Sequence, residues 1–258
     1  MKSNFHTHTS RCGHAESRER AYVEAAVRQG FSVLGFADHV PMPYENFRSP
    51  IRMGPEETEE YVRSIRALGE EFCGTIDIHV GFEAEYFPTL FHDLLRMLEP
   101  FDYEYLVLGQ HFLNSEIGGR YTGVAFDSAD TLNALVDQCS EALNTGAFSC
   151  FAHPDLFYFT GDETTYRSCM RRLCREAKAC GVPLEYNLLG AGLGRNYPTP
   201  SFWEEAAAVG NQVIIGWDAH SPSWLEQPEL EAEAVAFLDS LGLCRVDTLT
   251  LVRPRPRF

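Results

Sequence analysis

Histidine side chains are concentrated at the ends of the predicted strands of this 258-residue chain. Seven of its nine histidines lie at the carboxyl end of such a strand or just beyond it, and two carboxylates lie in the same kind of position. Neutral imidazole and carboxylate are the usual protein ligands of Zn, Mn and Fe(II). The candidate metal ligands are therefore His6, His8, His14, His39, Glu83, His111, His153, Asp218 and His220.

The set of candidate ligands is larger than one ion can use. An ion of this kind accepts about four to six donors, so the set predicts two or three divalent ions. In the segment His6-Thr7-His8, alternate residues of an extended chain point the same way, so both imidazoles can face one ion. Adjacent ions can activate a shared water and stabilise the oxygens of an in-line displacement at phosphorus. The pattern thus indicates phosphoester hydrolysis.

Short apolar runs alternate with longer amphipathic stretches along the chain. The predicted strands are residues 3–6, 33–38, 76–83, 105–110, 149–152, 184–187, 213–216 and 246–252. The predicted helices are residues 17–29, 55–72, 89–98, 129–145, 164–180, 201–209 and 227–241. This alternation indicates parallel strands with helical crossovers, and this number of units favours a closed α/β barrel. The carboxyl ends of all strands in such a barrel open on one face, where the ligands would meet.

The bulk properties of the chain exclude several classes of partner. Its net charge of −16 argues against nucleic acid and anionic membranes. No apolar run approaches the roughly 18–20 residues of a membrane span, and no secretory leader is evident. We therefore expect a cytoplasmic protein with one domain over residues 1–258. The eight cysteines are then reduced and mostly packing residues, with Cys12, between two candidate ligands, as the exception.

The order of these motifs resembles the polymerase-and-histidinol-phosphatase (PHP) superfamily of metal-dependent phosphoesterases. The matching motifs are His6-Thr7-His8 with His14, Asp38-His39, Glu83 after Gly81, His111, His153, and Asp218-Ala219-His220. The opening H-T-H-T-x-x-C-x-H is most similar to the branch that hydrolyses L-histidinol phosphate to L-histidinol and phosphate in histidine biosynthesis. The resemblance implies a distorted (β/α)7 barrel, in which residues 246–252 form an additional or irregular element.

The resemblance also implies how the ligands divide among three ions. The first ion would be held by His6, His8, Glu83 and Asp218. Glu83 would bridge to a second ion, which His111 and His153 also hold. The third ion would be held by His14, His39 and His220.

Other polar residues near these strand ends have secondary roles. Arg195 lies in a glycine-rich loop similar to the Arg-x-x-Pro loop of the histidinol phosphatase branch, and its paired donors could bind the substrate phosphate. Asp38 precedes a ligand and is either an orienting carboxylate or a weak ligand. Glu85 is either a similar partner, a contact of the substrate amine, or a solvated charge. We expect His79 and His92 to lie away from the site.

Two residues depart from the family pattern. Asn4 stands where the family often has aspartate, and an amide supplies no negative charge behind the first metal site. Trp217 replaces a small residue before the Asp-x-His motif, so we expect it to narrow the pocket.

The residues predict direct attack of an activated water on phosphorus, because no nucleophile motif for a phospho-enzyme is evident. The leaving alkoxide would take its proton from water or from an acid such as Asp218. A small nucleotide is the alternative substrate, and a non-catalytic metal-binding protein is the alternative of another class. The metal-dependent amidohydrolases also begin with His-x-His, but they usually require a lysine after a middle strand, and this chain has only Lys2 and Lys178.

Overall fold

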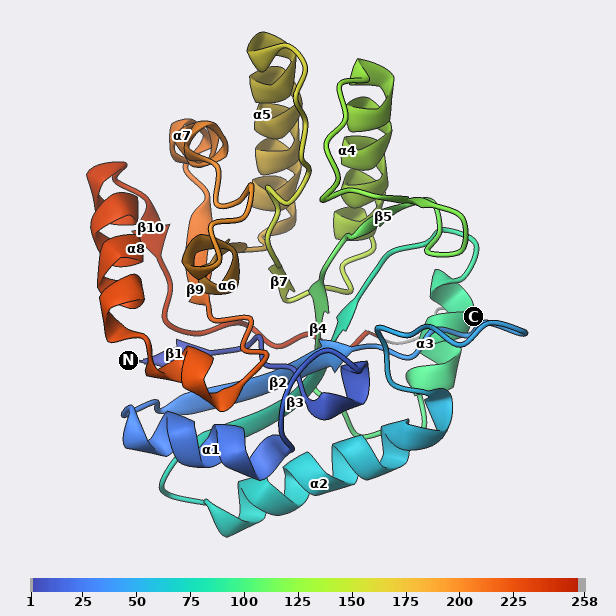
Figure 1. Ribbon diagram of the computed structural model, residues 1–258, viewed down its shortest axis with the longest axis vertical. Helices are drawn as coiled ribbons and strands as arrows, with labels where there is room; N and C mark the ends of the chain where they lie inside the picture. Colours follow the sequence, from blue (N-terminus) through green and yellow to red (C-terminus); the bar gives the residue numbers. More distant parts are fainter. Residues whose placement is uncertain (1, 255–258) are drawn as a thin grey trace.

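The computed structural model describes residues 2–254, and a parallel sheet runs through it. Its strands are β1 (Ser3–Asn4), β2 (Val33–His39), β3 (Asp77–Ala84), β4 (Tyr105–Leu108), β7 (Cys150–Phe151), β8 (Leu184–Asn187), β9 (Gln212–Gly216) and β10 (Cys244–Arg245). Neighbours in the sheet follow chain order, and each pair is parallel. Figure 1 shows the helices outside the strands, in the order of the sequence. The alternation of strand and helix therefore produces the predicted parallel sheet with helical crossovers.

The sheet curls round until the segments that follow its outer strands β1 and β9 meet. Thr7 forms a parallel bridge with Ala219. The amide of His8 donates to the carbonyl of Ala219 (3.0 Å), and the amide of Ala219 donates to the carbonyl of His6 (3.1 Å). Strands β1 to β9 thus form a curled barrel joined at its carboxyl ends, which confirms the distorted (β/α)7 prediction.

The extra strand β10 lies at the opposite end, where β1 and β9 separate. Cys244 and Arg245 pair with the first two residues of β9, and the hydroxyl of Ser3 donates to the carbonyl of Asp247. Residues 246–252 form no strand, because β10 ends before them, so the strand prediction is wrong and the alternative of an irregular element is confirmed. Leu249 packs in a cluster with Phe5 and other apolar side chains inside the barrel. The alternating apolar residues of this segment therefore close the barrel rather than extend the sheet.

The main helices are those that the amphipathic pattern predicts, with small shifts at their ends. They are α1 (Glu19–Arg28), α2 (Thr58–Glu71), α3 (Phe91–Leu98), α4 (Ala129–Asn144), α5 (Glu163–Cys180), α7 (Pro200–Val209) and α8 (Pro228–Ser240). Local signals fix several ends. The carboxylate of Asp162 accepts from the amide of Thr165 (2.8 Å) at the start of α5, and Gly181 ends that helix with a φ of 69°. None of the helices within residues 2–254 is long and apolar enough to cross a membrane.

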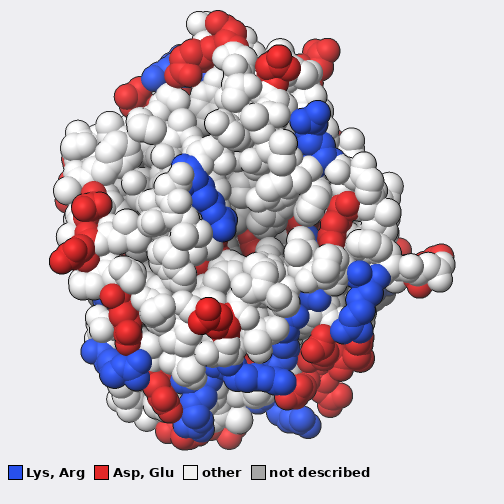
Figure 2. All heavy atoms as spheres, viewed as in Figure 1, with Lys and Arg blue, Asp and Glu red and all other residues white. Residues whose placement is uncertain are grey.

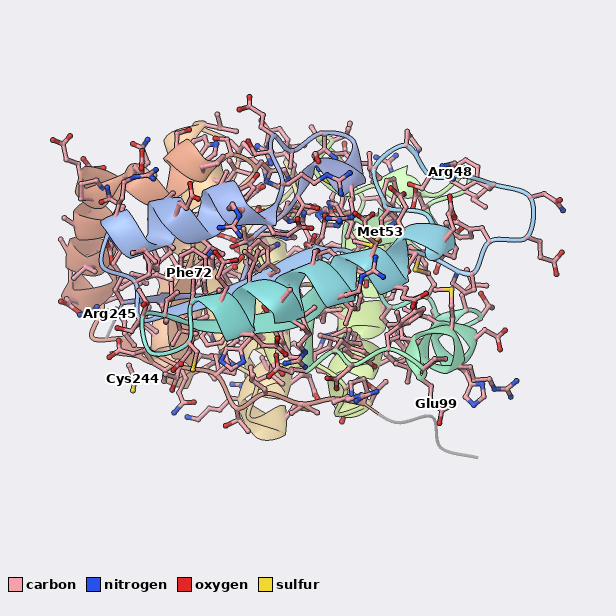
Figure 3. The ribbon with its side chains drawn as sticks, turned by 90° about the horizontal axis from the view of Figure 1, so that it is seen from below. Arg48, Met53, Phe72, Glu99, Cys244 and Arg245 are labelled. Atoms are coloured by element: carbon pink, nitrogen blue, oxygen red, sulfur yellow. The ribbon has the colours of Figure 1, made fainter. Side chains whose placement is uncertain are left out.

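Several short elements that the periodicity did not predict lie in the loops. They are η1 (Ser10–Cys12), η2 (Pro55–Glu57), η3 (Pro222–Glu226), α6 (Leu188–Gly192) and the hairpin of β5 (Phe112–Leu113) with β6 (Arg120–Tyr121). All except η2 follow the carboxyl ends of barrel strands, so they build the rim around those ends. Figure 3 shows the loop residues Arg48 and Met53 near the start of α2, and Phe72 at its far end.

A tyrosine fills the barrel below the strand ends. The Tyr105 hydroxyl donates to the carbonyl of Phe5 (2.8 Å), and the ring passes so close to β3 that a Cβ on Gly81 would lie 2.5 Å from it. Phe5, Val107 and Ile214 are buried in the same cluster. The barrel is therefore packed at this level, and polar side chains have space only above it.

Candidate metal centre

A cavity of about 630 Å³ opens at the carboxyl ends of the strands. Eight of the candidate ligands line it, and the remaining one, His6, is buried beneath. Figure 2 shows this face of the molecule hollowed near its middle, with acidic side chains visible inside. The upper walls are largely apolar and are formed by Ile51, Phe112, Leu156, Leu189, Leu193 and Trp224. The cavity thus has a polar floor and apolar walls, as ligand sites commonly do.

Glu83, at the end of β3, lies at the centre of the floor. Its Oε2 is 2.9 Å from Nδ1 of His39, and its Oε1 is 2.9 Å from Nε2 of His153 and 3.6 Å from Nε2 of His111. Gly109, the residue after the neighbouring strand β4, leaves room for this carboxylate, since a Cβ there would lie 1.9 Å from Oε1. The two oxygens of Glu83 face different imidazoles, as a carboxylate that bridges two ions would require.

Asp218 approaches the same centre from the end of β9. Its Oδ1 lies 3.1 Å from Nε2 of His8 and 3.5 Å from Nε2 of His6. The two imidazoles converge, with 3.0 Å between their Nε2 atoms, and each also lies within 3.7 Å of Oε2 of Glu83. These four side chains, which the resemblance assigns to the first ion, therefore surround one point.

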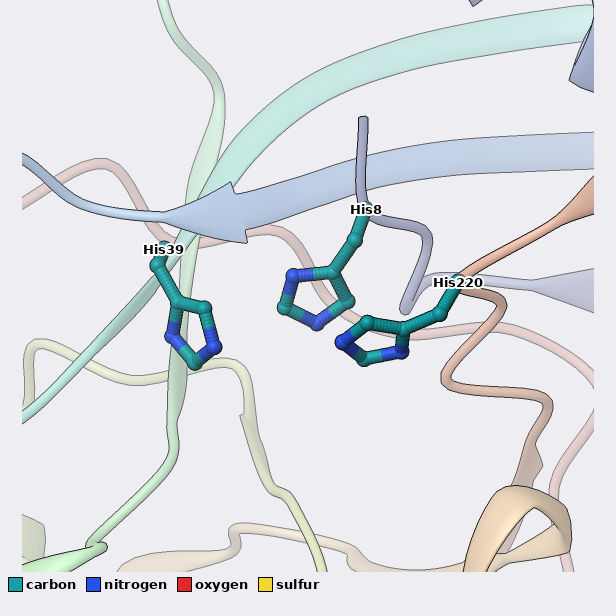
Figure 4. A group of neighbouring side chains, drawn as sticks. All are labelled: His8, His39 and His220. Carbon is teal, nitrogen blue, oxygen red and sulfur yellow. The ribbon is translucent and has the colours of Figure 1, made fainter. Parts of the chain in front are cut away.

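A second group of imidazoles lies on the side of the cavity formed by the β1, β2 and β9 loops. Figure 4 shows His8, His39 and His220 pointing toward one another, and donor atoms of all three lie within 4.8 Å of each other. His14 joins this group, with its ring centre 4.9 Å from that of His220. His14 donates from Nδ1 to the carbonyl of Cys12 (2.9 Å), so its Nε2 is the atom that can bind an ion. His8 therefore stands between the groups assigned to the first and third ions.

The donor atoms of this centre fit divalent ions. Within residues 2–254, Oδ1 of Asp218 and Nδ1 of His39 are buried and make no well-aligned hydrogen bond, although Nε2 of His8 and Oε2 of Glu83 lie 3.1 Å and 2.9 Å from them. Buried polar atoms without partners are costly in a folded protein. A cation bound among them would satisfy both atoms, and imidazole with carboxylate is the donor set of such sites.

The electrostatics of the centre also call for positive charge. Burial alone would lower the pKa of His6, but Glu185, Asp218 and Glu83 raise it well above its usual value. Burial alone would raise the pKa of Glu83, but His39 and other imidazoles lower it well below its usual value. The carboxylates thus stay ionised and favour the protonated form of His6. Divalent ions would supply that positive charge in place of the proton.

Two of the candidate ligands adopt a strained backbone conformation. His153 has a φ of 29° and Asp218 has a φ of 47°, in the left-handed region that residues with a Cβ rarely occupy. Such strain persists where surrounding structure enforces it, and it clusters at functional sites. Both residues turn their side chains over the strand ends, toward Glu83 and His8 respectively.

Glu185, in the middle of β8, supports the centre from below and was not predicted. Its Oε1 accepts from Nδ1 of His6 (2.8 Å), and its Oε2 accepts from the amide of His153 (3.1 Å) and from Asn187 (2.9 Å). It is buried, so these bonds fix the ring of His6 with Nε2 directed at the other ligands. A charged residue inside a short strand predicted to lie in the barrel, Leu184-Glu185-Tyr186-Asn187, is the signal that could have identified it.

Replacement of Glu185 by glutamine is expected to weaken metal binding about 10- to 100-fold, because partners behind the ligands orient them and raise their basicity. Competition with a chromophoric chelator would measure the dissociation constants. Glu205→Gln is the matched control, because Glu205 is buried against Arg171 at α7, away from the cavity. Equal affinities for both variants would contradict this role of Glu185.

Asp38 and Glu85 lie behind the ligands in the same way. Oδ1 of Asp38 is 3.3 Å from Nδ1 of His8 and accepts from the amide of His39 (2.8 Å). Oε1 of Glu85 is 3.5 Å from Nδ1 of His111, and Oε2 accepts from the amide of Phe112 (3.0 Å). Both carboxylates are buried and neither is part of the cavity lining, so they contact ligands rather than a substrate.

Arg195 lines the cavity from the loop that follows α6. Its Nη1 donates to the hydroxyl of Tyr197 (2.8 Å), and the Tyr197 ring lies 5.8 Å from the ring of His153. The loop is anchored by Asp155, which accepts from the amide of Thr199 (2.6 Å). The guanidinium is thus held over the imidazole and carboxylate centre with its other donors available.

The two departures from the family pattern have other roles. Asn4 braces the backbone, because its Oδ1 accepts from the amides of His6 (3.1 Å) and Trp217 (3.1 Å). The expectation that Trp217 narrows the pocket is wrong. Its ring packs edge-on against Phe31 (4.9 Å) with Lys2 above it, and it is not part of the cavity lining. Successive side chains of an extended segment point to opposite sides, so Trp217 packs in the hydrophobic core while Asp218 lines the cavity.

The remaining histidines lie outside the centre. His79, near the start of β3, is 3.0 Å from Glu104 and stacks on Phe5, at the end of the barrel opposite the metal centre. His92 lies on α3, with 47% of its side chain exposed. The nine candidate ligands, in contrast, all converge on Glu83 and Asp218 or on the imidazoles next to them.

Comparison with known proteins places this site in a family. The sequence pattern of the PHP domain matches residues 4–189. A probable histidinol-phosphatase of Deinococcus radiodurans is 30% identical over 234 residues, which cover 84% of this chain and 85% of the relative. The histidinol-phosphatase of Bacillus subtilis is 28% identical over 148 residues, or 54% of this chain and 53% of the relative.

The fold is also shared with solved structures. Histidinol phosphate phosphatase of Lactococcus lactis, solved with zinc, L-histidinol and phosphate, superposes with a TM-score of 0.74 at 16% identity, over 96% of this chain and 98% of that one. A putative histidinol phosphatase of Listeria monocytogenes gives a TM-score of 0.67 at 19% identity, over 86% and 97% of the two chains. From the matched motifs, the long relative and the shared fold, we conclude that this chain belongs to the PHP domain family.

Proposed function

We propose that this protein is a metal-dependent phosphomonoesterase that hydrolyses L-histidinol phosphate to L-histidinol and phosphate, a step of histidine biosynthesis. The observation that carries the proposal is the placement of Arg195 over a floor of imidazoles and carboxylates within one cavity. Relatives named as histidinol-phosphatases support the choice of substrate.

The centre would hold two or three divalent ions of zinc, manganese or iron. His6, His8, Glu83 and Asp218 would hold the first, and Glu83 with His111 and His153 the second. His14, His39 and His220 would hold the third, with His8 close enough to exchange between sites. When bound, such ions lower the pKa of water and neutralise the oxygens of a phosphoryl group.

The protein's own residues would position the substrate and govern its protons. Arg195 would bind the non-bridging phosphate oxygens through the donors that Tyr197 leaves available. Burial alone would raise the pKa of Asp218, but His6 and His220 lower it well below its usual value. Asp218 would therefore stay ionised and serve as a ligand, and the proton for the leaving group would come from water. Asp38 would position His8 and not touch the substrate.

The test is phosphate release from L-histidinol phosphate against a panel of nucleoside monophosphates, with metal content measured on the same sample. We expect a preference for histidinol phosphate that chelation and His111→Ala both abolish. Activity confined to nucleotides would retain the centre and reject the substrate. A fully metal-loaded protein without phosphatase activity would reject the enzyme altogether.

Replacement of Arg195 by alanine is expected to lower kcat/KM about 10- to 150-fold, because a hydrogen bond to a charged group contributes about 1.5–3 kcal/mol. Lysine should restore part of the loss, since it keeps the charge without the paired donors. Inhibition by inorganic phosphate should weaken in parallel. The control is Arg172→Ala, which removes an exposed arginine on α5 that pairs with Asp137. An unchanged inhibition constant for phosphate in Arg195→Ala would show that Arg195 does not bind this group.

A further inference from the structure

We propose that Glu16 and Trp224 form a subsite that binds the positively charged end of the substrate and so selects cationic phosphomonoesters. The proposal rests on the proposed function and extends it, from hydrolysis of the phosphate to choice of the leaving group. It concerns two residues that line the cavity together with the metal centre and Arg195.

The cavity lining contains three carboxylates, and two of them are committed to the centre. Glu83 and Asp218 are surrounded by imidazoles, as described above. The third is Glu16, an exposed side chain that makes no hydrogen bond or ion pair with any residue in the range 2–254. Its carboxylate is therefore the acidic group of the lining that a ligand can engage.

The backbone holds Glu16 in place although its side chain is unpaired. The amide of Glu16 donates to the carbonyl of the ligand His220 (2.7 Å), and its own carbonyl accepts from the hydroxyl of Tyr22. The next residue, Ser17, has a φ of 65° and accepts from the amide of Ser10 (2.9 Å). This loop is thus fixed directly against the ligands of the centre.

An aromatic ring lies on the same side of the rim. Trp224 belongs to η3, and its amide donates to the carbonyl of Ser221 (3.1 Å), the residue after His220. Its indole packs against α6, where a Cβ on Gly192 would lie 2.7 Å from Cζ3. The ring is half-buried and lines the cavity. The backbones of Glu16 and Trp224 are thus hydrogen-bonded to the consecutive residues His220 and Ser221, and both residues line the same cavity.

A carboxylate beside an indole face is a combination that binds cationic nitrogen. The carboxylate pairs with an ammonium or imidazolium group, and the indole attracts the same charge through its π face. The leaving group of L-histidinol phosphate carries both an ammonium and an imidazole. The nucleoside part of a nucleoside monophosphate is neutral near pH 7 and has no such charge. The subsite thus gives a physical reason to prefer the first substrate.

The experiment compares Glu16→Gln with wild type on L-histidinol phosphate and on glycerol phosphate, a neutral-alcohol ester. We expect the ratio of kcat/KM for the two substrates to fall roughly tenfold or more in Glu16→Gln, mainly through KM for L-histidinol phosphate. Trp224→Leu should lower the same ratio. Glu45→Gln, an exposed carboxylate outside this cavity, should keep the wild-type ratio.

The outcomes separate this inference from the proposed function. If wild type prefers L-histidinol phosphate and Glu16→Gln keeps that preference, the subsite is rejected and the proposed function stands. If wild type hydrolyses only neutral esters, the proposed function fails and the subsite fails with it. Inhibition by L-histidinol is an independent measurement, and it should weaken in Glu16→Gln while inhibition by inorganic phosphate changes less.

Discussion

Replacement of Glu83 by glutamine is expected to lower kcat/KM at least about a hundredfold and to reduce the metal content of the purified protein. The carboxylate lies within 3.7 Å of a nitrogen of His6, His8, His39, His111 and His153. An amide of the same shape keeps one acceptor oxygen, but it loses the negative charge and the second acceptor oxygen. Ions held by such a bridge contribute several kcal/mol to the transition state, and each 1.4 kcal/mol is about tenfold in rate.

The matched control for Glu83→Gln is Glu104→Gln. Glu104 is also paired with a histidine, at 3.0 Å from His79, but this pair lies at the end of the barrel opposite the metal centre. Steady-state kinetics would measure kcat/KM, and elemental analysis would measure metal content, on the same preparations of the two variants. We expect Glu104→Gln to retain metal and activity. Full metal content together with wild-type kcat/KM in Glu83→Gln would refute the central position of Glu83.

The fold was largely predictable because its signal is periodic and local. A parallel barrel repeats one unit, so each apolar run and each amphipathic stretch indicates the same arrangement. The convergence of the histidines followed from the fold, because parallel strands bring their carboxyl ends to one face. The failure at residues 246–252 has the opposite cause. Alternating apolar residues show that one side of a segment is buried, but not whether a strand partner or the interior of a barrel buries it.

The parts of the site that escaped prediction depend on long-range geometry. Glu185 contacts His6 from 179 positions away in the chain, and no local pattern reports that contact. Trp217 was placed in the pocket by its position next to Asp218, but its ring packs against Phe31, outside the cavity lining. The division of imidazoles among ions is similarly three-dimensional. The residue types can be read from the sequence, whereas the distances from His8 to the ligands of the first and third ions are set by the fold.

The burial of Arg52 also depends on long-range contacts that the sequence does not reveal, and its replacement is expected to have the second large effect. It lies in a long loop, where an arginine is normally solvated, yet only 1% of its side chain is exposed. Its Nε donates to Glu116 (2.7 Å), and its Nη2 donates to Glu85, the carboxylate that lies next to His111. The hydroxyl of Tyr44 also donates to Glu116 (3.2 Å). One buried cation therefore joins the loop before α2, the end of β3 and the β5–β6 hairpin.

Replacement of Arg52 by methionine is expected to lower the free energy of unfolding by about 3–5 kcal/mol, because it leaves two buried carboxylates without their cation. Urea unfolding followed by fluorescence would measure the loss as a shift of the midpoint. Arg48→Met is the control, since Arg48 lies in the same loop and pairs with Glu56 and Glu57, but 67% of its side chain is exposed. That variant should unfold at nearly the wild-type midpoint.

A second substitution distinguishes uncompensated charge from lost packing. In Arg52→Met with Glu116→Gln, one of the two stranded carboxylates becomes neutral, so part of the stability should return. If packing of the arginine side chain were the main contribution, the double variant would be no more stable than Arg52→Met. Because Glu85 also lies 3.5 Å from the His111 ring, Arg52→Met should weaken metal binding as well. The charge of Arg52 would then contribute both to the stability of the loop before α2 and to metal binding at the centre.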